Sequence, residues 1–418
     1  MPAPLVLAPP ERRSAFAIVF VVLLSSGAGN TALQSVLPAI GRSLRIPDIL
    51  VGSIFSLSAL LWALATPLWA RASDRHGRKP LIVLGTVGFA VSMAGMGLVV
   101  LAGLDGFLGP ILVFVGMLLT RAIFGFFGSA SSPASQAYVA DHTEPAERTG
   151  AMAVMASAGG LGTILGPAVA PLFVLPFVGL AGPMFAFSLF GVGLLAMIVR
   201  GLPGASLAGL GGRSQAAPPK PDGPPLRWRD PRVLPFIVFG FVLASAQVMG
   251  GQILGFLVID KLHIAPIRAQ PFIAAAMMAG AVATLSAQWG VIRLFRMTPR
   301  LLLRWGAGLA ALGSIGMGLA PNLATVIAAF ALTSLGFGLA RPGFTAGASL
   351  AVEAEEQGAV AGAISSITGA SSIFGPTFGL ALYGVGHALP FDLNAAVLIA
   401  LVIYASRHTV LRRAGEIA

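Results

Sequence analysis

Twelve long apolar stretches dominate the chain and limit what it can fold into. A helix needs about 20 apolar residues to cross a bilayer, and hydrophobic residues make up 56% of the 418 residues. A soluble protein of this size cannot bury so much apolar surface. The alternating pattern of a membrane barrel is absent, so the stretches predict transmembrane helices. They are residues 15–40, 48–71, 80–103, 110–140, 148–172, 182–200, 232–259, 268–293, 300–319, 323–350, 358–384 and 392–407.

The distribution of basic residues predicts the orientation of these helices. Placing both termini in the cytoplasm puts roughly 20 of the 26 Lys and Arg residues in cytoplasmic loops, as the positive-inside rule requires. The net charge of +11 therefore indicates membrane topology and not nucleic-acid binding. We expect a multi-pass protein of a bacterial inner membrane. Four basic residues fall on the outer side, namely Arg42, Arg45, Lys261 and Arg268. Two fall within spans, namely Arg121 and Arg341.

A Gly- and Pro-rich segment at 201–231 divides the chain into residues 1–200 and 232–418, with six apolar stretches on each side. Its composition predicts a flexible cytoplasmic linker. The sequence therefore predicts an all-α membrane protein built from two six-helix bundles.

The two halves also resemble each other. FGFFGSASSPAS near 124–135 is echoed by LGFGLARPGFTA near 335–346, and each half then carries a Gly-Pro pair. The offset between Pro167 and Pro376 is 209 residues, as it is between Pro133 and Pro342. Several matches in the same order indicate pseudo-symmetric bundles, the organisation of a secondary transporter.

A charged segment, ARASDRHGRKP at 70–80, separates the second and third stretches. We expect a loop there, with a turn at Gly77 and a helix restarting at Pro80. The segment resembles the signature loop of the major facilitator superfamily, Gly-x-Leu-Ala-Asp-Arg-x-Gly-Arg-Lys. The matching residues are Asp74, Arg75, Gly77, Arg78 and Lys79, whereas Ala70 and Ala72 replace the usual Gly and Leu.

In that family the Asp and Arg of this loop hold the two bundles together on the cytoplasmic side while the transporter faces outward. The resemblance implies the same gating role here. We expect Asp74 to face the N-terminus of the helix that begins near Gly358, where a carboxylate gains about 0.3–1 kcal/mol. The alternative is that the loop only determines topology.

The fifth stretch carries Gly162, Gly166 and Pro167, spaced so that a neighbouring helix can approach closely. We expect Pro167 to bend the helix. The pattern resembles the exporter motif Gly-x-x-x-Gly-Pro-x-x-Gly-Gly, and the resemblance implies an antiporter. Gly375 and Pro376 repeat the pair in the second half. The alternative is ordinary tight helix packing.

Arg121 lies inside the fourth stretch, four residues before Gly125, and resembles the Arg-x-x-x-Gly pattern of the family. An arginine at membrane depth is costly and by default functional. It either relays protons or meets an anionic substrate, and the alternative is a structural arginine bonded to neighbouring backbone. For Arg341, followed by Pro342 and Gly343, we expect a broken helix.

Polar residues within the stretches predict a substrate site. Buried amides that face lipid are costly, so they should face a cavity or another helix. In the family, the first, fourth, seventh and tenth helices line a central cavity. We therefore predict a substrate-binding lining, with interhelical hydrogen bonds as the alternative, formed by Asn30, Gln34, Arg121, Gln247, Gln252 and Arg341.

The position of the acidic residues bears on coupling. No stretch has a carboxylate at its middle, which argues against a cationic substrate and leaves few proton carriers. If protons are coupled, Asp141 or Asp48 must carry them, with His142 assisting.

These observations predict a secondary active transporter that exports a small amphipathic compound, drug or metabolite, by proton antiport with rocker-switch alternating access. The alternative is an organic-anion exchanger or importer without proton coupling, which uses Arg121 and Arg341. Cysteine is absent, and neither an HExxH pair nor a Gly-x-Ser-x-Gly elbow occurs. We therefore expect no enzyme activity, no cofactor and no metal. The expected partners are the substrate, protons and the lipid bilayer, with no nucleic acid, for a monomeric chain.

Overall fold

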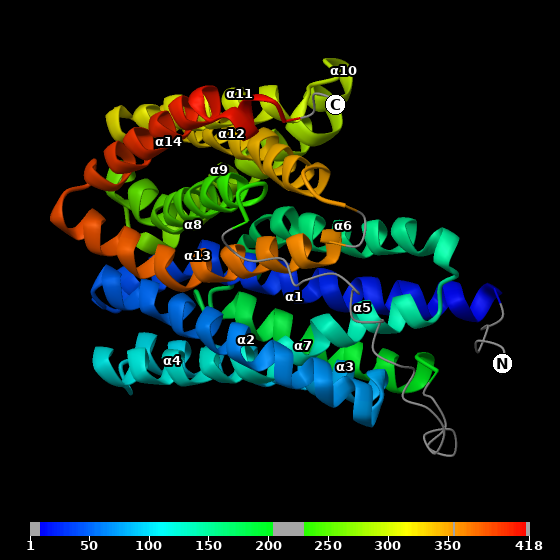
Figure 1. Cartoon of the computed structure of the whole chain (residues 1–418). Coiled ribbons are helices and arrows are strands. Elements are labelled where there is room, and N and C mark those ends of the chain that lie inside the picture. The colour runs from blue at the N-terminus through cyan, green and yellow to red at the C-terminus, as the bar shows by residue number, and fades with distance from the viewer. Residues whose placement is uncertain (1–8, 204–229, 354–355, 415–418) are drawn as a thin grey trace. The chain divides into compact units, whose positions relative to one another are not determined.

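The computed structural model describes residues 9–203, 230–353 and 356–414, and these are almost entirely helical (Figure 1). Within them, twelve helical spans are long and apolar enough to cross a membrane, which confirms the predicted all-α membrane fold. The elements are α1 (Pro9–Ser43), α2 (Asp48–His76), α3 (Arg78–Leu104), α4 (Pro110–Phe127), η1 (Gly128–Ala130), α5 (Ser131–Asp141), α6 (Pro145–Val169), η2 (Ala170–Phe173), α7 (Gly182–Gly201), α8 (Leu234–Leu262), α9 (Pro266–Leu285), η4 (Ser286–Val291), α10 (Ile292–Leu294), α11 (Pro299–Leu319), α12 (Leu323–Leu350), α13 (Gln357–Val385), α14 (Leu389–Arg407) and α15 (Thr409–Arg412).

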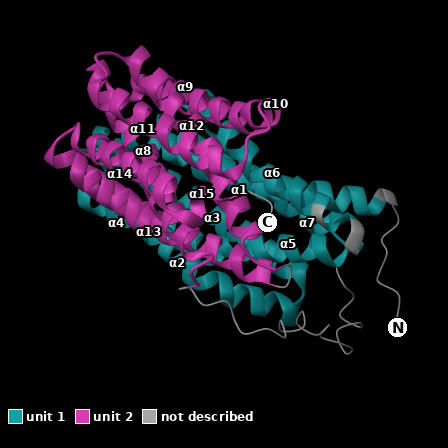
Figure 2. Cartoon of the chain, turned by 45° about the horizontal axis from the view of Figure 1, so that its top comes forward, with its two compact units in different colours: residues 1–46, 57–217 teal, residues 47–56, 218–418 magenta. Residues whose placement is uncertain are grey.

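The chain forms two compact units, coloured separately in Figure 2. Unit 1 comprises the described residues of 1–46 and 57–217, and unit 2 those of 47–56 and 218–418. The boundary passes through α2, so its first residues, up to Ser56, belong to unit 2. There the Ser56 hydroxyl lies 2.7 Å from the hydroxyl of Thr377 on α13.

The domain limits predicted at 200 and 232 remain a prediction. Most of the predicted linker, residues 204–229, lies outside the described residues.

Unit 1 is organised around a core to which α1, α3, α5 and α7 each contribute. Val19, Ile82, Val139 and Ile198 are completely buried there. Lipid tails are as apolar as these side chains, so burial itself gains little within a membrane. The close contacts between the side chains therefore stabilise the unit.

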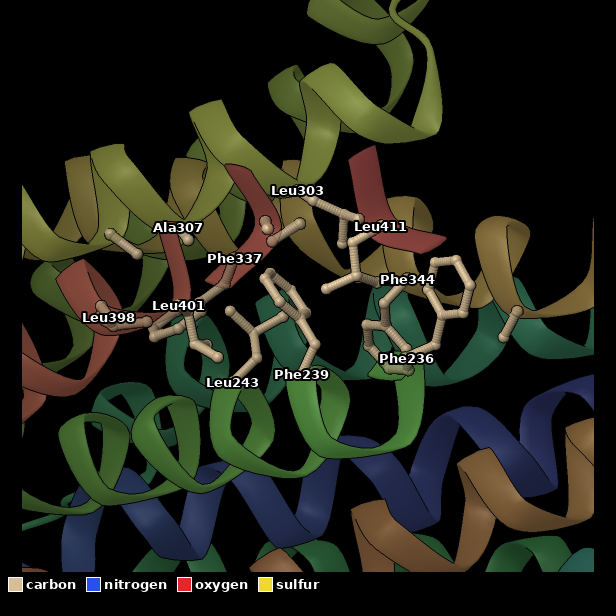
Figure 3. Close-up of a cluster of buried hydrophobic side chains, with 14 of the residues drawn as sticks. Phe236, Phe239, Leu243, Leu303, Ala307, Phe337, Phe344, Leu398, Leu401 and Leu411 are labelled. Atoms are coloured by element: carbon tan, nitrogen blue, oxygen red, sulfur yellow. The ribbon is translucent and has the colours of Figure 1, made fainter. Parts of the chain in front are cut away.

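Unit 2 has a core in which aromatic side chains of α8 and α12 meet (Figure 3). Phe236 and Phe239 on α8 are buried beside Phe337 and Phe344 on α12. Helices α11, α14 and α15 complete the cluster with the aliphatic side chains of Leu303, Ala307, Leu398, Leu401 and Leu411.

The expected loop at 70–80 is mostly helical, which corrects the prediction. Helix α2 continues to His76 and α3 begins at Arg78, so the connection is the single residue Gly77. Its φ of 91° lies in the left-handed region, which glycine adopts without a steric penalty. Pro80 falls in the first turn of α3, where its missing N–H costs no hydrogen bond. Asp74 therefore lies on a helix and not on a loop.

The predicted break at Pro342 is also absent, since α12 runs without interruption from Leu323 to Leu350. Pro167 and Pro376 likewise lie inside the continuous helices α6 and α13. A proline removes one backbone hydrogen bond, but lipid offers no water to bond the groups of an unwound turn. The helix therefore remains helical on both sides of the proline.

An ion cluster fastens the beginning of α8 to the beginning of α13 in unit 2. The Arg232 guanidinium donates hydrogen bonds to Asp230 at 2.8 Å and to Glu356 at 2.9 Å. These bonds lower the pKa of both carboxyl groups and raise the pKa of Arg232. Unit 1 has a comparable pair at the beginning of α6, in which Arg12 lies 3.3 Å from Glu147.

We expect the thermal stability of the protein to fall in acid, and the Arg232 cluster to cause part of that fall. Because the pKa values of Asp230 and Glu356 are lowered in the folded state, their contribution is complete above about pH 4.5 and is lost as pH falls below it. Arg232→Gln should lower the Tm at pH 7 and flatten the decline towards about pH 3, measured by tryptophan fluorescence in detergent. Arg268→Gln, an exposed arginine elsewhere in unit 2, is the matched control. An unchanged decline in Arg232→Gln would contradict the assignment.

Candidate substrate and coupling site

Arg121 is the most deeply buried charged residue that the structure describes, and it lies within the span Pro110–Asp141, which α4, η1 and α5 form. Its side chain is 2% exposed. The guanidinium donates a 2.8 Å hydrogen bond from Nη2 to the Oδ1 atom of Asn30 on α1. It also lies over the Phe124 ring, 4.4 Å from the ring centroid. Contacts with an amide oxygen and an aromatic face are those that make a buried cation tolerable in a membrane.

The sequence of α4 positions this arginine. Met117, Arg121, Phe124 and Gly125 recur at the three- and four-residue spacing of one helix face, and all four are buried. The Trp62 ring on α2 contacts the Phe124 ring, with 5.3 Å between the ring centroids. Phe124 therefore contacts both the guanidinium and a second aromatic ring.

Helix α1 connects Arg121 to the glycine motif of α6. Thr31, the residue after Asn30, donates a 2.9 Å hydrogen bond from Oγ1 to the carbonyl oxygen of Gly162. A Cβ atom at Gly162 would lie 2.8 Å from the backbone nitrogen of Ala28, and one at Gly166 would overlap the Ala28 carbonyl oxygen. Two adjacent residues of α1 therefore contact the buried arginine on α4 and the glycines of α6. We call the close contact of Gly162 and Gly166 with α1 the glycine crossing.

Of the predicted lining residues, the structure brings Asn30 and Arg121 together in unit 1. Gln34 is half-buried on α1, one turn after Asn30. Gln247 and Gln252 lie on α8 in unit 2, the first half-buried and the second 8% exposed. Arg341, in contrast, is exposed on α12.

The predicted gating residues form an ion cluster at the α2–α3 turn. The Arg78 guanidinium donates to the Asp74 carboxylate and, from Nε at 2.9 Å, to Oδ2 of Asp141 at the end of α5. Lys79 donates to the carbonyl oxygens of Val199 and Leu202 at the end of α7, at 2.9 and 2.7 Å. The turn is therefore tied to both α5 and α7.

The remaining gating residue and the proton-coupling candidates occupy three different settings. Arg75 is exposed at the end of α2. Asp141 is exposed and shares Arg78 with Asp74, and the Nδ1 atom of the adjacent His142 lies 2.8 Å from the Tyr138 carbonyl oxygen. Asp48 is the first residue of α2 and is half-buried. Within the described ranges no group of three metal-ligating side chains occurs.

Sequence reasoning missed a polar cluster at the end of α8 and α13. Tyr383 donates a 2.7 Å hydrogen bond to Oδ2 of Asp260, and the rings of Tyr383 and His387 are stacked 4.6 Å apart. The available signal was the four-residue spacing of Tyr383 and His387, which on a helix would place the two side chains on one face, although His387 lies just beyond the end of α13 at Val385. The partnership with Asp260, 123 residues away, has no sequence signal.

A chain with twelve apolar spans, two compact units and a buried arginine has the organisation of a polytopic membrane transporter. The family model of the Major Facilitator Superfamily matches residues 19–376. The chain belongs to this superfamily, whose members are transporters and not enzymes.

Relatives and solved structures agree with this membership. Multidrug resistance protein 2 of Bacillus subtilis strain 168 is 25% identical over 395 residues, which are 91% of this chain and 92% of that protein. The class D tetracycline resistance protein of Salmonella ordonez is 30% identical over 159 residues, or 37% of each chain.

Two solved structures show the same fold. One is a bacterial homologue of the human lysosomal transporter Spinster in an inward-facing, unoccupied conformation, with a TM-score of 0.74, 13% identity and 98% coverage of both chains. The other is the human organic anion transporter MFSD10, with a TM-score of 0.63, 20% identity and coverage of 95% of this chain and all of that one.

The glycine crossing gives a test of the site's framework. Gly166→Ala should lower the free energy of unfolding by about 1–3 kcal/mol, because the added methyl group meets the backbone of α1. Gly160→Ala, on the same helix but with open space around it, should not destabilise the protein. Tryptophan-monitored thermal unfolding of the two variants makes the comparison, and an equal loss in both would show that α1 does not constrain Gly166.

Proposed function

We propose that this chain exports a small amphipathic organic compound, neutral or anionic, in exchange for protons. In this proposal two six-helix bundles expose a central site to each side of the membrane in turn. The observation that carries the proposal is the arrangement on α1, where Asn30 holds Arg121 and Thr31 holds Gly162. A single helix thereby joins a buried charge to the crossing that resembles the exporter motif.

The names of the relatives support export. A relative that matches over nine-tenths of both chains is a multidrug resistance protein, and a relative that matches over 37% of both chains is a tetracycline resistance protein. The tight crossing of α6 on α1 is the structural counterpart of the glycine motif that led us to expect an antiporter.

The charges within the spans support a neutral or anionic substrate. The described spans carry Arg121 and Arg341 away from their ends, whereas the acids Asp48, Asp260 and Asp392 lie within a turn or so of an end. A cationic drug would meet repulsion without a compensating carboxylate at mid-membrane. Because Arg121 is 2% exposed, a substrate that contacts it must displace some of the side chains that cover it.

The cluster at the α2–α3 turn supports proton coupling through Asp141. The guanidinium of Arg78 is shared between Asp74 and Asp141, and protonation of Asp141 would remove one of its two negative partners. Asp74 would then be the remaining negatively charged partner of Arg78. A proton would in this way weaken the attachment of α5 to the turn.

The alternative of an organic-anion exchanger or importer without proton coupling is favoured by one observation. Both charged residues away from the span ends are arginines, and an arginine binds carboxylates in a fork-like geometry. Coupling to a counter-anion would then replace coupling to protons.

Reconstitution into proteoliposomes distinguishes the two functions, with tetracycline as the first probe and a panel of aromatic carboxylates as the second. Antiport predicts that an imposed pH gradient drives uptake and that a protonophore abolishes it. Flux that ignores the gradient and requires a counter-anion on the opposite side would replace the antiporter with the exchanger.

Substitution of Arg121 should abolish transport while the protein still inserts and folds. Arg121→Ala should reduce the initial rate by about tenfold or more. A tenfold change corresponds to about 1.4 kcal/mol of free energy. Arg121→Lys keeps the charge but loses the planar guanidinium, whose Nη2 atom donates to Asn30, and should also fail. If the lysine variant transports normally, the guanidinium geometry has no role.

Substitution of Asp74 should impair turnover more than folding. Asp74→Asn removes a negative partner of Arg78 and shifts the balance between the two transport states. Transport rates should therefore fall while the Tm changes little. Arg71→Gln, an exposed charge on the same helix end, is the matched control. Normal transport by Asp74→Asn would count against a gate at this turn.

We also propose a location in a bacterial inner membrane, with both termini in the cytoplasm and the chain acting as a monomer. The chain lacks cysteine, so single cysteines can be introduced without background labelling. A cysteine at Arg71 should react with an impermeant maleimide only after cells are opened. Labelling in intact cells would reverse the orientation.

A further inference from the structure

The structure assigns a proton-binding site to Asp260, Tyr383 and His387 at the shared end of α8 and α13, and we propose that a proton bound there fastens α13 to the first residues of α2. This inference deepens the proposed function and rests on it for its role in transport.

The side chains of Tyr383 and His387 both approach one carboxylate oxygen of Asp260. Oδ2 of Asp260 accepts the 2.7 Å hydrogen bond from Tyr383 and lies 3.9 Å from Nε2 of His387. Tyr383 is 1% exposed, and the side chains of Asp260 and His387 are 20% and 67% exposed. The histidine therefore reaches water while the carboxylate is largely enclosed by protein.

Two groups, a carboxylate and an aromatic ring, contact the imidazole of His387. Histidine is the side chain whose charge ordinarily changes between about pH 5 and pH 8. A carboxylate close to Nε2 attracts the imidazolium, although the exposure of His387 weakens that attraction. The Tyr383 ring lies beneath the imidazole with only 14° between the ring planes, and a cation on an aromatic face gains a further attraction.

Protonation is a simple addition at this site. Water on that side supplies one proton to the imidazole, the histidine gains one positive charge, and no bond between heavy atoms is made or broken. The Asp260–His387 contact then becomes an ion pair that joins the end of α8 to the residues just after α13.

The other ionisable side chains at this end of unit 2 lie on four elements, and the pH response includes them. Lys261 and His263 are at the end of α8 itself, and Arg268 is on α9. Asp392 is in the first turn of α14, and Asp48 begins α2. In the His387–Asp260 pair, a histidine lies next to a carboxylate, so protonation of the histidine changes the charge beside that carboxylate.

The segment of α13 that this pair fastens also holds α2. Pro376 lies inside α13, and the helix beyond it ends at Val385 beside His387. Thr377, directly after the proline, contacts the Ser56 hydroxyl at 2.7 Å. A Cβ atom at Gly52 would lie 2.8 Å from the Pro376 carbonyl oxygen, so α2 and α13 are in close backbone contact. Fastening the end of α13 therefore stabilises its hold on residues 47–56.

The direction of the effect follows from these contacts. Acid on this side charges His387, strengthens the α8–α13 pair and keeps residues 47–56 against α13. Neutralisation weakens the pair and allows that contact to open. A proton gradient with its acid side here would then close this end after each export step.

Spin labels test the movement in the purified full chain in nanodiscs, without gradient or substrate. The labels are placed at Ile49→Cys and Val385→Cys, two exposed positions on α2 and α13 in a chain without native cysteine. The short-distance population should increase from about pH 8 to about pH 5.5. His387→Gln and Asp260→Asn should each lose this response.

His408→Gln is the matched control, because His408 also follows a tyrosine by four residues, with 5.2 Å between the rings. It should keep the full pH response. A response that survives in His387→Gln, or a wild-type distance that does not change with pH, would overturn the proposal.

A second measurement does not depend on the variants being well folded. In protein with 13C-labelled histidine, the His387 resonance, identified among five by its loss in His387→Gln, should titrate between about pH 5 and pH 8. A histidine that keeps one charge state across that range would also refute the site. If the labels respond to pH but no pH gradient drives transport, the proposed antiport fails and this inference stands.

Discussion

Lipid provides no partners for hydrogen bonds, and the whole chain is built around that constraint. Every backbone group inside the bilayer must be bonded within the protein, which leaves helices as the solution for a chain without a barrel pattern. The same constraint explains why Pro167, Pro342 and Pro376 stay inside continuous helices. It also explains why the polar side chains at depth meet one another, as Asn30 and Arg121 do.

The buried charge and the helix crossings are parts of one framework in unit 1. Neighbouring residues of α1 bond Arg121 on α4 and Gly162 on α6, so one helix connects the buried charge to the close contact with α6. The turn at Gly77 is similarly tied to α5 through Arg78 and to α7 through Lys79. A transporter needs such rigid pieces, because movements of intact units expose a site to alternate sides.

Much of the fold was predictable because each span is a local property of the sequence. Apolar length alone located twelve helices, and the cost of a charge in lipid singled out Arg121. Contacts between distant residues were not predictable, since nothing in the sequence pairs Arg78 with Asp141 or Asp260 with Tyr383. The predicted loop at 70–80 was wrong because charged residues suggested a loop, whereas one glycine suffices to reverse the chain.

The single-residue connection at Gly77 has a mechanical consequence. A long loop between two helices is flexible, so each helix can rotate without moving the other. With only one residue between α2 and α3, a twist or tilt of α2 is passed directly to its neighbour. Residues 47–56, at the other end of α2, are grouped with unit 2, so this helix belongs to both units.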